Sequence, residues 1–177
     1  MSWSLSPVFR KTPLWADRAL RVAGRCLYLA NAYESKCAFI LSIAEISNFA
    51  EANPRASPSA VLASASRTRL LGQVVGKLKR QWEIADRELE LLERARDARN
   101  FIAHEGAAFG YVFQAEREST LAHLEKLRGY LRDLIAGDNL VSTWVYEIEE
   151  KEPAPASISD FFAREAESWA FEPASDA

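Results

Sequence analysis

The chain has 177 residues, 49% of them hydrophobic, which is enough for one domain with a sizeable core but too few to expect two independent domains. Its formal net charge is −3 and its sequence pI is about 5.5. These values argue against binding nucleic acid over the whole surface, because phosphate contacts need concentrated Lys and Arg. Any nucleic-acid site must therefore be a local patch.

The cysteine usage and the apolar runs indicate a cytoplasmic protein. Cys26 and Cys37 fall eleven residues apart in one predicted helix, about 16 Å along its axis, which is too far for a disulfide. We expect both to be reduced thiols in the core. The longest apolar run, residues 37–44, is far shorter than the roughly 20 residues of a membrane helix, and we find no signal-peptide pattern. We expect a soluble, cytoplasmic protein without a membrane partner.

Residues 1–11 show no periodicity and predict an N-terminal arm. A long helix follows, for which we predict Thr12 as the capping residue and Pro13 in the first turn. Apolar residues at three-and-four spacing continue the helix to about Ala50. The stripe consists of Leu20, Ala23, Leu27, Ala30, Cys37, Leu41, Ala44 and Asn48. Glu34 falls in the middle of this stripe, and a carboxylate there must find a partner.

Two prolines and several small polar residues end the long helix at 53–58, and a short helical turn follows at 59–65. Residues 70–80 then predict an amphipathic helix in the most basic segment of the chain. The basic residues have no acidic residue between them and are Arg67, Arg69, Lys77, Lys79 and Arg80. Such a run is more often a solvated helix face than a nucleic-acid patch, and both interpretations stay open here.

The next predicted helix, residues 83–104, separates apolar from polar side chains. At 100° per residue, one stripe forms the expected core face and consists of Ile84, Leu91, Ala95, Ala98 and Ile102. The nearly opposite face consists of Leu89, Glu93, Arg96, Asn100 and His104. Arg99 projects from the side between the two faces. Glycines at 106 and 110 end the helix.

The second half of the chain predicts an antiparallel helix at 115–136, a break or kink at 137–139, and renewed helical spacing at 140–148. A proline-marked linker at 151–156 leads to a short amphipathic helix at 157–170. We therefore divide the chain into the arm, a helical domain at 12–150, and a linker with an acidic tail helix at 151–177.

The acidic tail contrasts with the basic helix. From residue 143 onward nine Asp and Glu face only two basic residues. We expect the tail to dock back onto the body or onto a second subunit, and one hypothesis is that it covers the basic helix. No period-two pattern indicates a strand, so the expected fold is an all-α bundle of four to five main helices plus a C-terminal amphipathic helix.

The sequence Arg99-Asn100-x-x-x-His104 brings together residues that can cleave RNA without a metal. Imidazole accepts and donates protons near neutral pH, and guanidinium binds phosphate while staying charged. Asn100 lies one turn before His104 and can orient it. Alternatively, the same residues only cap the helix and complement its dipole.

This motif resembles the active-site signature of the HEPN superfamily of small helical domains, many of which are RNases. The segment Leu70-Leu71-Gly72-Gln73-Val74-Val75-Gly76-Lys77-Leu78 also resembles a Leu-Gly-Gln-Leu type segment of several members, and the similarity covers residues 13–145. The resemblance implies a HEPN-like homodimer whose two copies of Arg99 and His104 line one cleft at the dimer interface. It also implies that RNA is the substrate and that no metal or cofactor is needed.

On this basis we predict a metal-independent endoribonuclease, a toxin or phage-defence effector with room for an antitoxin partner. Asn100 joins Arg99 and His104 as a catalytic residue, and Arg96 supports them. Glu34 is the candidate supporting acid, although a plain buried ion pair would explain it equally well. The alternative function is a non-catalytic module that binds RNA, a nucleotide or a protein.

Two further positions qualify this prediction. HEPN toxins paired with a nucleotidyltransferase antitoxin often carry Tyr two residues after the histidine, where this chain has Gly106. This departure argues against silencing by nucleotide transfer. The other histidine, His123, lies among charged residues and is expected to be a solvated surface residue. Too few His and Cys are present for a convincing metal site.

Overall fold

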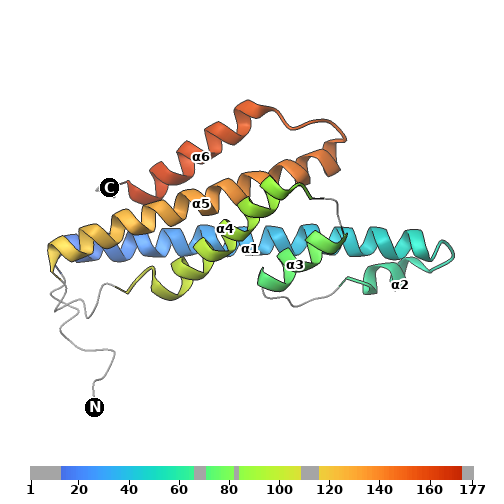
Figure 1. Ribbon diagram of the computed structural model, residues 1–177, viewed down its shortest axis with the longest axis horizontal. Helices are drawn as coiled ribbons and strands as arrows, with labels where there is room; N and C mark the ends of the chain where they lie inside the picture. Colours follow the sequence, from blue (N-terminus) through green and yellow to red (C-terminus); the bar gives the residue numbers. More distant parts are fainter. Residues whose placement is uncertain (1–12, 66–70, 82–83, 109–115, 173–177) are drawn as a thin grey trace, which may run out of the picture.

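Two long helices form the framework of the structure, a computed structural model that describes residues 13–65, 71–81, 84–108 and 116–172 (Figure 1). Helix α1 (Leu14–Ala52) has 39 residues and α5 (Arg117–Glu150) has 34. At 1.5 Å per residue both are about 50 to 60 Å long. They pack side by side, so every shorter helix has a long surface to lie against.

Four shorter helices pack on this framework: α2 (Pro58–Ala63), α3 (Leu71–Gln81), α4 (Asp86–Glu105) and α6 (Ala156–Phe171). Helix α4 crosses α1 and packs along α5, and α3 packs on α1 and α4. Helix α6 runs back along α5 on the opposite side from α3 (Figure 1). The described residues contain no strand, and the predicted all-α bundle is confirmed.

The buried side chains of α1, α4 and α5 meet in one apolar core. Cys26 and Cys37 lie in it as free, buried thiols, as predicted. Burial raises the pKa of each thiol to about 12, so both stay protonated at neutral pH. In the described part of the chain, no helix is both long and apolar enough to cross a membrane.

Two predicted helix starts differ from the structure. Helix α1 begins at Leu14, so Pro13 is the residue that precedes the helix, whereas we predicted it in the first turn. Thr12, the predicted capping residue, lies outside the described residues. Helix α4 begins at Asp86 and not at 83. The Glu88 carboxylate accepts a hydrogen bond from the Ala85 amide at 3.1 Å, which satisfies a free N–H at this helix start.

Helix α5 continues through Gly137, where we predicted a break or kink, so the predicted break is wrong. Gly137 is buried where α5 meets α4 and α1. A Cβ at this position would overlap the methyl group of Ala95 and lie 3.3 Å from the Tyr33 hydroxyl. The glycine is therefore needed for the close approach of three helices and not for a turn.

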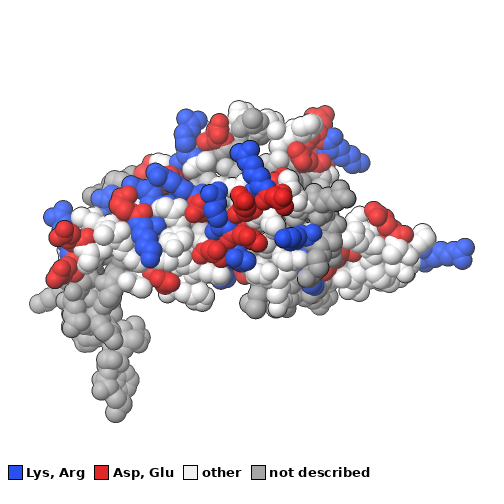
Figure 2. All heavy atoms as spheres, in the orientation of Figure 1, with Lys and Arg blue, Asp and Glu red and all other residues white. Residues whose placement is uncertain are grey.

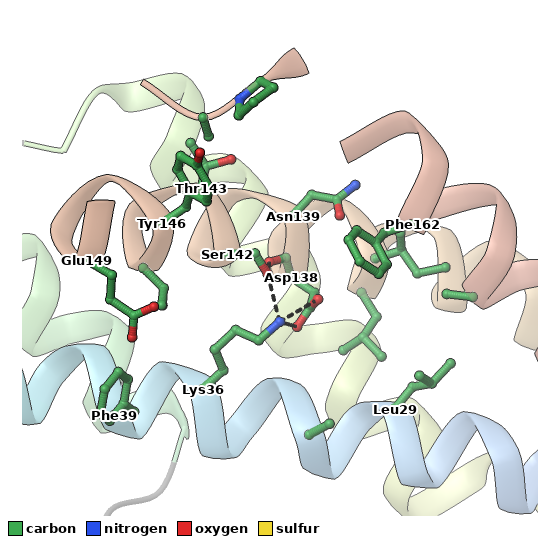
Figure 3. Close-up of a pocket in the computed structure, with 17 residues that line it drawn as sticks. Leu29, Lys36, Phe39, Asp138, Asn139, Ser142, Thr143, Tyr146, Glu149 and Phe162 are labelled. Carbon is green, nitrogen blue, oxygen red and sulfur yellow. Dashed lines mark hydrogen bonds and ion pairs between the residues drawn. The ribbon is translucent and has the colours of Figure 1, made fainter. Parts of the chain in front are cut away.

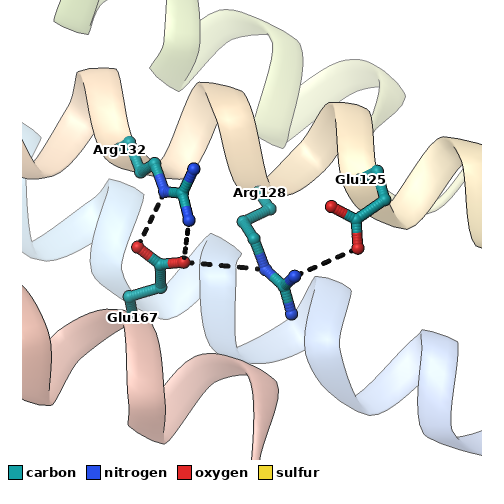
Figure 4. Close-up of polar contacts among 4 residues, drawn as sticks. All are labelled: Glu125, Arg128, Arg132 and Glu167. Carbon is teal, nitrogen blue, oxygen red and sulfur yellow. Dashed lines mark hydrogen bonds and ion pairs between the residues drawn. The ribbon is translucent and has the colours of Figure 1, made fainter.

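The C-terminal helix docks back onto its own chain. Arg25 of α1 donates hydrogen bonds to the carbonyls of Trp169 and Glu172, at 2.6 and 3.0 Å. On α5, Arg132 donates two hydrogen bonds to the Glu167 carboxylate, at 2.8 and 2.7 Å (Figure 4). Within the described residues α6 contacts α1 and α5 and not α3. The hypothesis that the tail covers the basic helix is therefore wrong for α6.

Candidate functional site

The motif lies on the outer side of α4, because the inner side of this helix packs in the core. Ala95, Ala98 and Ile102 are buried as predicted. Leu92 and Phe101 are buried as well, whereas Leu91 and Ile84 are only half-buried. The core face is thus rotated slightly from the predicted stripe, which leaves the polar residues of α4 outside.

Arg99 lies between the two faces and makes a contact with another helix. Its guanidinium donates a short hydrogen bond to the Glu34 carboxylate of α1. Both side chains are about one fifth exposed, at 21% for Arg99 and 23% for Glu34. The Arg99 Nε atom is also buried, and no described residue accepts its hydrogen. The structure thus brings together the predicted arginine and the predicted acid, and it leaves a buried guanidinium donor, Nε, without a partner among the described residues.

Asn100 and His104 follow on the outer surface of α4. Both side chains are exposed, and neither makes a hydrogen bond or ion pair with any described residue. They are four residues apart and therefore share a helix face. His104 also occupies the last turn of α4. This imidazole is free to meet a substrate or a second protein chain.

Arg96 does not join Arg99 in the structure. It donates to its neighbour Asp97, at 2.9 Å from Nε and 2.8 Å from a terminal nitrogen. Its aliphatic part lies against α3, because a Cβ added at Gly72 would be 3.8 Å from Arg96 Cδ. Arg96 thus lies close to Gly72 of α3, where an added Cβ would make only an ordinary van der Waals contact.

The end of α4 is held by a histidine that we expected to be a solvated surface residue. His123 of α5 is half-buried, and its Nε2 is 3.2 Å from the Gly106 carbonyl oxygen. Its ring is tilted against Phe101, with centroids 5.8 Å apart. The expectation of a solvated His123 is therefore wrong. No spacing rule links residues 106 and 123, because they meet only through the packing of α4 on α5.

The basic segment contributes little concentrated charge within the described residues. Lys77 pairs with Glu45 of α1 at 3.4 Å, and Lys79 is exposed. Arg67 and Arg69 lie outside the described residues. Figure 2 shows acidic and basic side chains interspersed on the face that carries α4 and α5. Phosphate binding on this face would thus depend on a few residues such as Arg99.

Metal ligands are not grouped in the described part of the chain, where no three His, Cys, Asp or Glu are placed to hold one ion. The candidate site therefore consists of one anchored guanidinium, one exposed amide and one exposed imidazole. Compared with known proteins, the chain matches no family model, no curated protein and no solved structure. The HEPN resemblance thus depends on the motif and on the all-α setting in which it lies.

Proposed function

We propose that this protein is a metal-independent endoribonuclease of the HEPN type that acts as a homodimer, as a toxin or phage-defence effector. One observation carries the proposal: Glu34 fixes Arg99 from another helix, while His104 on the same α4 has no partner among the described residues. A fixed cation and a free imidazole on one helix suit phosphate chemistry, since the cation binds charge that develops on phosphoryl oxygens.

The proposed reaction needs an acid and a base. One imidazole removes the proton of a ribose 2′-OH, whose oxygen then bonds to the adjacent 3′-phosphorus. The bond from phosphorus to the 5′ oxygen of the next nucleotide breaks, and a second imidazole donates a proton to that oxygen. The products are a 2′,3′-cyclic phosphate and a 5′-hydroxyl. Since each chain offers one His104, a second copy supplies the second imidazole.

The test compares the purified protein with His104→Ala and Arg99→Ala on structured and single-stranded RNA in the presence of EDTA. We expect cleavage by the wild type, loss of about 100-fold or more in each variant, and no cleavage of DNA of the same sequence. Arg99→Lys should recover little activity, because an ammonium ion cannot bind phosphate through two parallel hydrogen bonds.

Two matched variants control for unspecific effects. Arg94→Ala removes another arginine of α4, one that makes only a long, exposed ion pair of 3.8 Å with Asp133. It should cleave as the wild type does. His123→Asn removes the other histidine and should affect stability more than cleavage. Intact RNA in every wild-type reaction, or equal cleavage by His104→Ala, would overturn the proposal.

A second candidate function is binding without cleavage. The observation that favours it is the Arg99–Glu34 ion pair itself, because a guanidinium already neutralised by a carboxylate attracts phosphate less strongly. Under this alternative His104→Ala leaves RNA or partner binding unchanged while no product forms with any variant. Fluorescence anisotropy with labelled RNA, run beside the cleavage assay, separates the two functions.

A further inference from the structure

A pocket of about 540 Å³ lies away from the motif, between α1, α5, the linker that follows α5, and α6 (Figure 3). Apolar side chains from all three helices line most of it, among them Leu29 of α1, Ile135 of α5 and Phe162 of α6. The linker contributes Ala154 and Pro155. A concave, mainly apolar site with a few polar groups is the usual form of a small-molecule site.

The polar groups in the middle of the pocket satisfy one another. Lys36 Nζ donates to both carboxylate oxygens of Asp138, each at 2.8 Å, and to Ser142 Oγ at 2.7 Å. Ser142 in turn donates to the Asp138 carbonyl at 2.7 Å. These hydrogen bonds match the three donors of an ammonium group. This part of the pocket therefore offers a ligand neither net charge nor an unused Lys36 donor.

One charged group in the described lining has no partner. Glu149 makes no hydrogen bond or ion pair with any described residue. In Figure 3 its side chain points from α5 toward Phe39 of α1. The surrounding end of α5 is acidic as well, with four glutamates and one lysine in residues 147–152. The electrostatic potential at this end of the pocket therefore favours a cation.

Aromatic side chains also line this pocket. Phe39 and Phe162 are 49% and 58% exposed, so both are accessible to a ligand, and Tyr146 lines the pocket too. The faces of aromatic rings attract cations, and their area also covers hydrocarbon. An anion would instead approach an unpaired carboxylate and acidic neighbours, which disfavours it.

We propose that this pocket binds a hydrophobic organic cation, an amine or quaternary ammonium with an aliphatic or aromatic body. The charged group lies at Glu149 between aromatic rings, and the hydrocarbon lies along Leu29, Ile135 and Phe162. The proposal is independent of RNA cleavage, because the pocket shares no residue with Arg99, Asn100 and His104.

The test uses three probes with the same chain length: octyltrimethylammonium, octanol and octanoate. Isothermal titration calorimetry of the full chain should give the order cation, then alcohol, then carboxylate. One charge contact near the surface and one ring contact together predict about tenfold tighter binding of the cation than of the alcohol. Phe162→Ala should weaken all three probes.

Glu149→Gln separates charge from shape, since Glu149 is exposed and a glutamine of nearly the same size should leave the fold unchanged. It should weaken octyltrimethylammonium about fivefold and leave octanol unchanged. The matched control is Glu147→Gln, which changes an exposed glutamate of α5 outside the pocket lining. It should weaken octyltrimethylammonium binding by less than Glu149→Gln does and leave octanol binding unchanged. Equal binding of all three probes, tightest binding of octanoate, or no binding would overturn the proposal.

Discussion

Helix α1 makes two interhelical ion pairs from positions only two residues apart. Glu34 pairs with Arg99 of α4, and Lys36 pairs with Asp138 of α5. Residues two apart on a helix point about 200° apart, so the two pairs lie on opposite sides of α1. One side carries the candidate RNase motif, and the other carries the pocket.

The two ion pairs differ in how completely they are satisfied. Their exposure is similar, 21% and 23% for Arg99 and Glu34 against 32% and 33% for Lys36 and Asp138, so burial does not separate them. Lys36 has an acceptor for each donor, whereas Arg99 has a buried Nε without one. Native structures rarely leave buried donors unpaired, and among the described residues Tyr33 Oη and Arg128 Nε are in the same state as Arg99 Nε. The two ion pairs thus differ in hydrogen bonding, and the unpaired donor of Arg99 is compatible with the proposed phosphate site.

Gly137→Ala should cause the largest loss of stability, and it should affect the structure on both sides of α1. Its new methyl group would overlap Ala95 where α5, α4 and α1 meet. We expect a loss of about 3 kcal/mol in the free energy of unfolding, because overpacking a tight helix contact forces backbone shifts. Urea denaturation followed by circular dichroism measures it.

Gly129 provides the matched control on the same helix. A Cβ there meets nothing within 4 Å, so Gly129→Ala should stabilise the protein by about 0.5 to 1 kcal/mol. Adding Ala95→Gly to Gly137→Ala should recover part of the lost stability, since it removes the overlapping methyl group. Equal effects of the two glycine substitutions would show that the close approach at Gly137 does not matter.

Alkaline pH should lower the stability of the fold that carries both sites without any substitution. The pKa of Cys26 and of Cys37 is raised from 9.0 to about 12 by burial. Below about pH 9 both folded and unfolded thiols are protonated, so their contribution is constant. Above it the unfolded chain loses protons first, and stability falls by about 1.4 kcal/mol per thiol per pH unit until about pH 12.

Urea denaturation at about pH 8 and about pH 10 checks this sign. The double variant Cys26→Ala, Cys37→Ala should lose less stability over the interval than the wild type does. An equal loss in both proteins would mean that other groups cause the alkaline effect.

Glu34→Gln and Lys36→Met break the two ion pairs separately. Each should cost about 1 to 2 kcal/mol of stability, because each leaves a half-buried charge without its partner. Their effects on RNA cleavage should differ. Glu34→Gln releases Arg99 and should lower cleavage about tenfold or more, whereas Lys36→Met should not change it beyond its effect on the folded fraction. Equal cleavage by both variants would remove the functional distinction between the two sides.

The sequence predicted the all-α bundle and most helix boundaries because apolar spacing in long helices is a strong local signal. It also singled out Glu34, since a carboxylate within an apolar stripe needs a partner. It did not predict that α5 continues through Gly137 or that His123 holds the end of α4. Both depend on which helices pack together, and local patterns do not specify that.

The pocket could not be predicted from the sequence either, for the same reason. Lys36 is far from Asp138 and Glu149 in the chain, and only the parallel packing of α1 and α5 brings Lys36 and Asp138 to within 2.8 Å of each other (Figure 1). From the sequence, Phe162 was predicted only to be an apolar residue of the tail helix. The docking of α6 places it at the pocket.

The smallest effect should come from loosening α6, which borders the pocket and not the motif. Hydrogen bonding to Arg132 lowers the pKa of Glu167, so this contact stabilises the docked helix above the ordinary pKa and is lost as the pH falls. Glu167→Gln should speed amide exchange in α6 about threefold at neutral pH, as expected for a surface ion pair. It should also weaken octyltrimethylammonium binding slightly and leave RNA cleavage unchanged. If cleavage changed as much as binding did, the two sides of α1 would be coupled and could not act as separate sites.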